Sequence, residues 1–562
     1  MISTLNQIST FILYFLYFSF PFFTLNLNYD FPDTSKLLLL IIVTSLLIFV
    51  ESLKVAHSKK LTFVNSTYLL PLFLITCFYL LSSFIKSSNI ILTLVSASST
   101  STWITLFLFY LILSEKPENL KTGLLRFSVL GSGVVTVYIL LMYFGILPKN
   151  VITPGGNLLT TAIFYFTLII YLVARLAISN SNKKIFLILS LGLASVTLVF
   201  QIFHLISDQK PILLPHSYAV SIFSRVAKDP QSLLLGVGPA NFISAFTLEK
   251  PAAINQTPLW NIIFTSSSSL FTNLTTETGI ISGLAYLAII CLSVYLLIKM
   301  IFKNQKAKFP QLFSLIILSL ILLFFPASTL LLFFFVSQLA ASAGINSAKT
   351  LNLQKLNFFV YFFPLFSLFL VFFTTYLLLK AYTAEYKYFQ SLKAIEDKDL
   401  TLAYNLQKQT LSENPFLDKY HLGLSQTSFL LADELLKAKN LTPENSEKIP
   451  KLISQSIEEA RTAVNLNESS VLAWDNLTKI YFTLISFASG ADKWAVEIAK
   501  QTIALDPKNP NHYLMLAQIY QKLDIKEEAD KNIRFALSLK PDLNLPSNIM
   551  PLPESPDKER FP

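Results

Sequence analysis

Residues 357–379 read NFFVYFFPLFSLFLVFFTTYLLL, an uncharged run of apolar and aromatic residues that decides the class of this chain. A helix needs roughly 20 such residues to cross the hydrocarbon core of a bilayer. Comparable uncharged runs recur from the N-terminus to about Tyr382 and then stop. The sequence therefore predicts an all-α protein with a transmembrane bundle over residues 1–380 and a tail of ordinary composition.

We expect eleven membrane helices, because irregular backbone cannot satisfy its hydrogen bonds in lipid. The composition agrees, since 53% of the 562 residues are apolar and only 14% are charged. The two helices around Pro326 could instead form one broken span. The expected helices cover residues 8–25, 37–53, 67–85, 94–114, 123–145, 158–176, 185–203, 279–298, 311–327, 329–345 and 357–379.

The net charge of +10 is distributed unevenly along the chain. Residues 1–380 carry 23 Lys and Arg against 9 Asp and Glu, whereas residues 381–562 carry 21 against 25. In the first part, fifteen basic residues lie in alternate short loops and three in the loops between them. Because basic loops stay in the cytoplasm, we expect a multi-pass protein of the cell membrane with a cytoplasmic N-terminus and an extracytoplasmic tail. We expect no nucleic-acid partner, since the sequence has no basic stripe with interleaved aromatics.

The segment between the seventh and eighth expected helices, residues 204–278, is much longer than the other loops and falls on the predicted outer side. Long ordered loops often carry function. It contains an expected helix from His216 to Lys228, a Gly-Val-Gly turn at 236–238 and four serines at 266–269. Hydroxyl and amide groups next to aromatic rings are typical of sugar binding. The Gly-x-Gly turn has no preceding strand and is therefore no dinucleotide fingerprint.

On these motifs, region 213–290 resembles the large extracytoplasmic loop of the O-antigen ligase and polymerase family of membrane glycosyltransferases. The matching features are the amphipathic helix, GVGPANF at 236–242, the polar stretch and TETGI at 276–280. NYDFPDTSK at 28–36, PGGN at 154–157 and a repeat-containing tail also agree. The resemblance implies transfer of a glycan from a polyprenyl pyrophosphate to an acceptor hydroxyl, with arginine on the diphosphate, a histidine near the acceptor and no cofactor.

The family's loop motif usually has His-Asn where this chain has Ser268 and Ser269. His204 and His216 lie in the same loop and could replace that base. Arg225 is the one arginine left for the outer membrane face, and the planar guanidinium suits phosphate oxygens. The predicted catalytic residues are therefore Arg225, His216 and His204. The predicted substrate-binding residues are Gly236, Gly238, Asn241, Trp260, Ser268, Ser269 and Glu277.

Each of these residues also has a structural interpretation. Arg225 could lie on the solvated face of its helix beside Lys228, His216 could cap or pack, and His204 could be an interfacial residue. The glycines at 236 and 238 could be needed only for a tight backbone turn. Asp30 and Asp33 could ligate a metal, but two carboxylates flanking Pro32 are more typical of a turn and a helix start, so we predict no metal.

The tail shows a repeat, since Pro507 and Pro541 lie 34 residues apart, which is the TPR period. We expect an α-solenoid of TPR-like repeats over residues 381–545, of about four helix pairs, and a disordered segment over 546–562. A concave solenoid face usually binds a protein partner, although a cap or spacer without a ligand is the alternative. Tyr513, Leu516, Ala517, Tyr520, Ala529 and Ala536 occupy the usual large and small positions of the last repeat, and Trp474, Leu477, Tyr481 and Ala495 those of the preceding one.

The sequence therefore predicts a membrane glycosyltransferase whose partners are a lipid-linked oligosaccharide and an acceptor glycan, lipid or protein. A glycan-binding or assembly scaffold of the same family that has lost its base is the alternative. A transporter or flippase is a third class, but it would carry ionisable residues inside its helices. Helix-centre positions here are apolar or hydroxylic, and Glu51 lies near a helix end.

Overall fold

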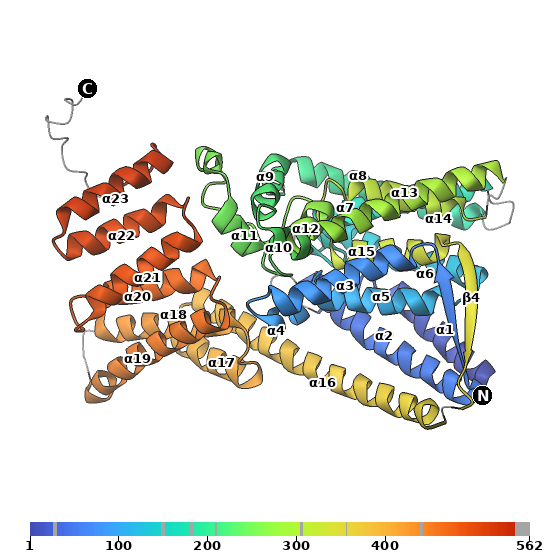
Figure 1. The fold of residues 1–562 in the computed structure, drawn as a ribbon, viewed down its shortest axis with the longest axis horizontal. Coiled ribbons are helices and arrows are strands. Elements are labelled where there is room, and N and C mark those ends of the chain that lie inside the picture. The colour runs from blue at the N-terminus through green and yellow to red at the C-terminus, as the bar shows by residue number, and fades with distance from the viewer. Residues whose placement is uncertain are drawn as a thin grey trace. The chain divides into compact units, whose positions relative to one another are not determined.

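The computed structural model describes residues 1–25, 31–147, 152–178, 184–207, 211–303, 307–355, 357–437 and 442–545. The chain is almost entirely helical, and it groups into two compact units that the chain enters and leaves several times (Figure 1). The first unit comprises residues 1–216, 229–240 and 266–385, and the second comprises residues 217–228, 241–265 and 386–562. The predicted motif at 28–36, with Asp30, and the predicted disordered end at 546–562 lie wholly or partly outside the described residues.

The first unit is built from apolar helices. Six of the described helices are long and apolar enough to cross a membrane. They are α2 (Phe31–Ser58), α6 (Glu118–Tyr143), α7 (Leu158–Ile178), α8 (Lys184–Ser207), α13 (Ile280–Phe302) and α16 (Asn357–Glu396), of which α16 continues into the second unit. Shorter helices accompany them, namely α1 (Ile2–Ser19), α3 (Leu69–Ile85), α4 (Ile90–Val95), α5 (Thr100–Ser114), α10 (Pro230–Leu235), α12 (Leu270–Thr278), α14 (Phe309–Ile321) and α15 (Thr329–Ser342).

The expected count of eleven spans is thus larger than the six helices of spanning length. Helices α3, α5, α14 and α15 are apolar but have only 13–17 residues. At 1.5 Å per residue, α14 is about 20 Å long, less than the roughly 30 Å of the hydrocarbon core. The apolar runs overestimated these helices because they include non-helical residues, such as those from Phe325 to Ser328 around Pro326.

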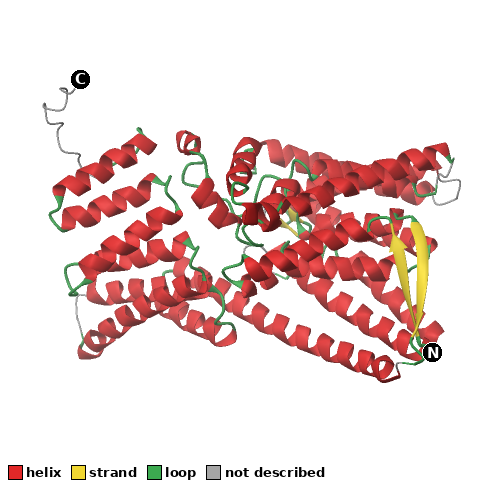
Figure 2. Cartoon of the chain, viewed as in Figure 1, coloured by secondary structure: helices red, strands yellow, loops and turns green. Residues whose placement is uncertain are grey.

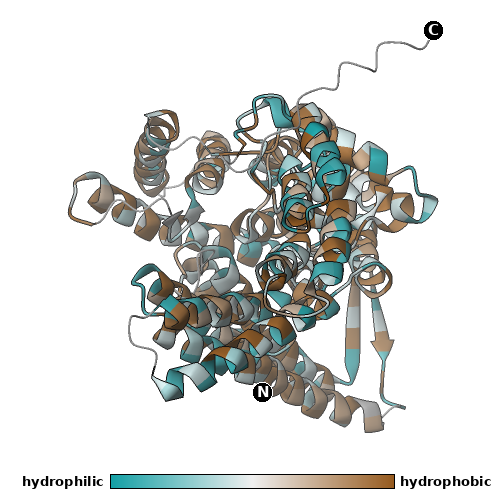
Figure 3. Cartoon of the chain, turned by 90° about the vertical axis from the view of Figure 1, so that its left-hand side faces the viewer, coloured by the Kyte–Doolittle hydropathy of each residue, from teal (hydrophilic) through white to brown (hydrophobic). Residues whose placement is uncertain are grey.

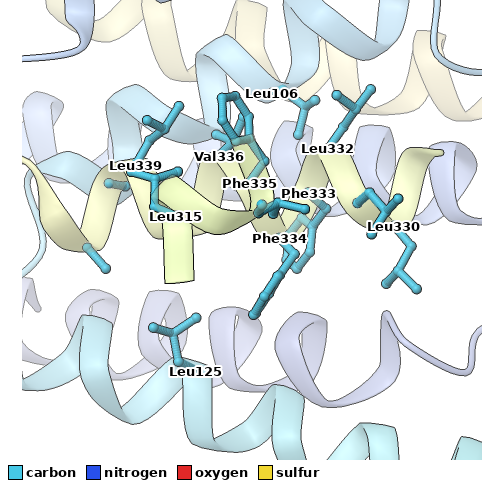
Figure 4. Close-up of a cluster of buried hydrophobic side chains, with 14 of the residues drawn as sticks. Leu106, Leu125, Leu315, Leu330, Leu332, Phe333, Phe334, Phe335, Val336 and Leu339 are labelled. Atoms are coloured by element: carbon cyan, nitrogen blue, oxygen red, sulfur yellow. The ribbon is translucent and has the colours of Figure 1, made fainter. Parts of the chain in front are cut away.

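Helices α14 and α15 form an antiparallel hairpin rather than one broken span. They pack against each other, and the Lys308 ammonium before α14 donates to the carbonyl of Ala343 after α15 at 2.8 Å. Every residue of α15 is buried. Phe333 stacks on Phe20 at 4.0 Å between ring centroids, and Leu106, Leu315 and neighbouring residues complete this core (Figure 4). Helix α15 is therefore the central helix of the first unit.

Contacts within the first unit join its loops into two sets. In the first set, two ion pairs join helix ends. Lys116 pairs with Glu51, and Lys308 pairs with Glu118 at 3.0 Å. The first set also contains a two-stranded antiparallel sheet of β1 (Lys60–Ser66) and β4 (Ile345–Asn352), drawn in yellow in Figure 2, with Lys60 opposite Asn352. The sequence did not predict this sheet.

The second set joins loops at the other ends of these helices. Lys36 donates to the Pro154 carbonyl at 2.5 Å, beside the small sheet of β2 (Ile152–Thr153) and β3 (Gly156–Asn157). The Leu270 amide donates to the Leu322 carbonyl at 3.1 Å. The Asp33 carboxylate accepts the amide of Thr329, the first residue of α15, at 2.9 Å, and negative charge at a helix N-terminus is stabilising. The structure thus gives Asp33 a helix-capping contact.

The tail of the second unit is a stack of helix pairs. Helices α18 (Asp418–Lys437) and α19 (Pro443–Leu466), α20 (Val471–Leu484) and α21 (Ala491–Leu505), and α22 (Pro510–Lys522) and α23 (Lys526–Leu539) pack as consecutive pairs, and α17 (Leu400–Glu413) packs on α18. Ala460, Ala495, Ala517 and Ala536 are fully buried, so small residues let the helices approach closely. The tail helices nearest the viewer in Figure 3 carry both hydrophilic and hydrophobic residues. These pairs form a TPR-like solenoid.

The second unit also contains parts of the long loop. Helix α9 (His216–Val226) begins at the last residue of the first unit and continues into the second. Helix α11 (Phe242–Glu249) and the 3-10 helix η1 (Ala252–Gln256) follow, and α11 packs against α21 of the tail. The predicted loop is therefore shared between the two units.

Candidate functional site

The glycine motif lies against the end of α12 in the first unit. The Val237 amide donates to the Thr276 carbonyl and the Gly238 amide to the Glu277 carbonyl, each at 3.0 Å. The Ser82 hydroxyl at the end of α3 donates to the carbonyls of Leu235 and Glu277, at 2.5 and 3.0 Å. These bonds hold residues 235–238 against residues 276–277.

Two glycines make this approach possible. Gly236 has φ +69°, and a Cβ there would lie 2.2 Å from the carbonyl carbon of Glu277. Gly279 has φ +88°, and a Cβ there would lie 2.0 Å from the carbonyl oxygen of Leu234. Only glycine adopts such a backbone freely and leaves this space empty. The backbone packing therefore explains why glycine is needed at position 236, without any role in binding a ligand.

The serine run begins α12. Ser269 is the N-cap, and its hydroxyl accepts the Thr272 amide at 3.1 Å in a reciprocal capping box. Ser267 donates to the Thr272 hydroxyl at 2.8 Å. Ser267, Ser268 and Ser269 are all buried. A polar helix start is thus enclosed within the unit, where its hydroxyl groups bond to one another.

Ser268 faces a histidine from the other end of the loop. Its hydroxyl lies 2.9 Å from Nδ1 of His216, the first residue of α9. The His216 ring meets the edge of Phe324 at 6.0 Å between centroids, and the histidine is otherwise exposed. The structure therefore places an exposed imidazole on a buried serine.

A buried carboxylate lies one helix length from this contact. Glu277 accepts the side-chain amide of Asn273 at 2.9 Å, and it is buried at the end of α12. Asn273 is not among the residues predicted for the site. Its position four residues before Glu277 on one helix face was the available signal.

The remaining predicted residues have other environments. Arg225 belongs to the second unit, where its Nη1 donates to the carbonyls of Glu249 and Lys250 at 3.0 and 3.5 Å. These carbonyls end α11, and basic side chains commonly cap such ends. Trp260 has the Lys540 ammonium 5.1 Å above its ring, and Asn241 is the N-cap residue of α11. His204 on α8 packs on the rings of Tyr143 and Phe203.

The predicted site residues thus separate into two groups. His204, His216, Gly236, Gly238, Ser268, Ser269 and Glu277 belong to the first unit, and Arg225, Asn241 and Trp260 to the second. The structure brings His216 to Ser268 but gives Arg225 a carbonyl environment of its own. Within the described ranges, no group of three His, Cys, Asp or Glu residues could hold a metal ion.

Comparison with known proteins identifies no functional site in this chain. No protein-family model matches the chain, and no curated protein matches it. Among solved structures the chain is similar to TTC0263, a thermophilic TPR protein of Thermus thermophilus, at 17% identity over 31% of this chain and 88% of that chain, with a TM-score of 0.24. None of this bears on the resemblance to the O-antigen ligase family, which stays a prediction.

Two further solved structures are similar to the chain. The crystal structure of MamA is 20% identical over 27% of this chain and 94% of that chain, with a TM-score of 0.17. An IFIT1 monomeric mutant with m7Gppp-AAAA is 10% identical over 85% and 96%, with a TM-score of 0.19. TM-scores this low carry no argument about this chain. The TPR-like character of the tail therefore rests on its own helix pairs and on the 34 residues between Pro507 and Pro541.

Proposed function

We propose that the chain is a membrane glycosyltransferase of the O-antigen ligase or polymerase type, which moves a glycan from a polyprenyl pyrophosphate to an acceptor hydroxyl at the outer face of the membrane. One observation carries this proposal. The resembled family has a histidine where this chain has Ser268, and His216 reaches that serine from a distant part of the loop at 2.9 Å. In this proposal His216 serves as the base next to Ser268.

The His216–Ser268 contact suits a general base. If Nδ1–H donates to the Ser268 hydroxyl, the lone pair of Nε2 remains free on the exposed edge of the ring. Nε2 then accepts the proton of the acceptor hydroxyl as its oxygen bonds to the anomeric carbon of the donor. The bond from that carbon to the pyrophosphate oxygen breaks, and the polyprenyl pyrophosphate leaves with the electron pair.

The loop contacts support an eleven-crossing topology. Glu51 with Lys116, Lys308 with Glu118, and β1 with β4 each join two loops that the charge distribution assigns to the cytoplasm. Lys36 with Pro154, and Leu270 with Leu322, each join two loops assigned to the outside. With eleven crossings, every one of these pairs is separated by an even number of helices. In this proposal the shorter helices α3, α5, α14 and α15 are four of the eleven crossings. The lipid is locally thin beside α3, α5 and α14, whereas α15 is enclosed by protein.

The long loop and the tail share one side of the membrane in this topology. Four helices, α13 to α16, separate residues 241–265 from the tail in the sequence, so both emerge on the same face. Contacts between them within the second unit support this arrangement. In the most apolar stretch of α8 only 22% of the residues are buried, and in that of α16 only 17%. Such exposed apolar surfaces are expected to face lipid.

A transfer assay tests the proposal. The full chain in lipid vesicles is given a polyprenyl-pyrophosphate disaccharide and an oligosaccharide acceptor, and release of polyprenyl pyrophosphate is measured together with acceptor elongation. We expect turnover by the native chain and a fall of about 10²–10⁴-fold in His216→Ala, the range for loss of a general base. Binding of the donor without turnover by the native chain would favour the scaffold alternative and overturn the transferase.

A further inference from the structure

The turns between the helix pairs of the tail form a row of equivalent positions. They are residues 467–470 between α19 and α20, residues 506–509 between α21 and α22, and residues 540–543 after α23. Each carries polar side chains, among them Ser469, Lys508 and Lys540. Such a row lies along one edge of a solenoid, because each repeat packs on its neighbours in the same way.

One short segment of the long loop contacts all three turns. The Ser244 hydroxyl lies 3.0 Å from the Ser469 hydroxyl of the first turn. Asn255 donates to the Lys508 carbonyl of the second turn at 2.8 Å, and its own carbonyl accepts from Lys540 of the third at 3.1 Å. Residues 244–255 therefore run along the edge of the solenoid and bind successive repeats.

A buried ion pair lies in the middle of this interface. The Lys250 ammonium is 2.8 Å from the Asp506 carboxylate, and both side chains are at most 3% exposed. Burial by itself would raise the pKa of Asp506, but His512 and Lys250 outweigh this and hold that pKa below its usual value. Neither charge would be stable there without the other. The loop segment is thus fixed to the tail by a contact that tolerates little change.

This interface is connected to the proposed base. Arg225 donates to the carbonyls of Glu249 and Lys250, next to the ion pair. Arg225 lies on α9, and α9 begins with His216. The segment that carries the ion pair therefore also holds α9, the helix whose first residue is the proposed base.

We infer that the outer loop of the same chain is the tail's partner, and that Asp506, Lys250 and Arg225 are positioning residues for α9, the helix whose first residue is His216. This inference rests on the proposed function for its activity readout. It replaces a free acceptor-binding role for this edge of the solenoid, since residues 244–255 occupy it.

The test uses the full chain in vesicles, with Cys77→Ala and Cys291→Ala as the background. In Lys250→Met, we expect kcat to fall at least tenfold, with KM for the polyprenyl-pyrophosphate disaccharide unchanged. The matched control is Lys437→Met, which removes an exposed ion pair with Asp433 in the same tail and should leave kcat and KM as they are.

A disulfide between the loop and the tail distinguishes a positioning role of Lys250 from a general loss of folding in Lys250→Met. Ser244→Cys with Ser469→Cys replaces two hydroxyls 3.0 Å apart, a spacing that suits a disulfide. Added to Lys250→Met, the oxidised pair should restore most of kcat, and reduction should remove it again. Full kcat in Lys250→Met, or no recovery in a fully crosslinked variant, would overturn the inference.

The crosslink also separates this inference from the proposed function. We call the contact of residues 244–255 with the tail the clamp. The rate of disulfide formation between positions 244 and 469 measures whether the clamp is closed, and this measurement does not depend on glycan transfer. We expect fast formation in the native background and slower formation in Lys250→Met. Equal rates would overturn the clamp whether or not the chain transfers glycan, whereas a native chain with an intact clamp and no turnover would refute only the transferase.

Discussion

Lys250 and Asp506 form a 2.8 Å ion pair between the long loop and the tail, and neither side chain has meaningful contact with solvent. The pair belongs to a compact unit made from two loop segments and the helix pairs that follow α16. The free energy that this ion pair contributes determines whether these loop segments and the tail fold together.

Removing one partner of this pair should be far more damaging than removing both. Asp506→Ala leaves the Lys250 charge buried without a partner, and we expect a loss of about 3–5 kcal/mol in the free energy of unfolding. Lys250→Met combined with Asp506→Leu removes both charges and should lose less. Denaturant unfolding of the full chain in detergent, followed by tryptophan fluorescence, measures both. A double variant as unstable as Asp506→Ala would contradict this explanation.

His421 gives the tail a dependence on pH. Burial would lower the pKa of His421, but hydrogen bonds to Glu459 at 2.6 Å and to the Pro415 carbonyl at 2.9 Å outweigh it and raise the pKa above its usual value. Stability from the protonated ring is therefore fully present below the unfolded pKa of about 6.5 and is lost as pH rises through the higher folded pKa.

We expect the tail to unfold more easily as the pH is raised from about 6 to about 8, with a loss on the order of 1 kcal/mol. His421→Gln should be less stable at the lower pH and should lose this dependence. Thermal unfolding across the pH range checks it. An equal slope in the native chain and the variant would assign the effect to another group.

The backbone contact around the glycine motif predicts a sharp difference between glycines. Gly236→Ala places a Cβ 2.2 Å from the Glu277 carbonyl carbon at a positive φ. We expect it to cost at least about 1–3 kcal/mol and to reduce the yield of folded protein. Gly133→Ala on α6 is the control, because a Cβ there meets nothing within 4 Å. A melting temperature for Gly236→Ala equal to that of Gly133→Ala would refute the packing role.

Much of the fold follows from local sequence. Uncharged runs located the apolar helices, although they overestimated those near Pro326, and the 34-residue spacing located the last helix pairs of the tail. Local pattern could not show the β1–β4 sheet, because it pairs Lys60 with Asn352 across nearly 300 residues.

The candidate site was only partly visible in the sequence. The residues GVG at 236–238 and TETGI at 276–280 were singled out separately, and the structure joins them by backbone hydrogen bonds. The contact of His216 with Ser268 spans 52 positions, and no spacing rule connects them. Arg225 was favoured for its charge, but its carbonyl partners at the end of α11 depend on a packing that the sequence does not encode locally.

The most direct test of the central claim exchanges the two residues of the candidate site. His216→Ser alone should lose glycan transfer, since no base then faces the acceptor. His216→Ser combined with Ser268→His returns an imidazole to the same place from the other side of the contact. We expect turnover of the polyprenyl-pyrophosphate disaccharide in the double variant to recover at least tenfold over His216→Ser. Full activity in His216→Ser would contradict the account, as would a folded double variant no more active than the single one.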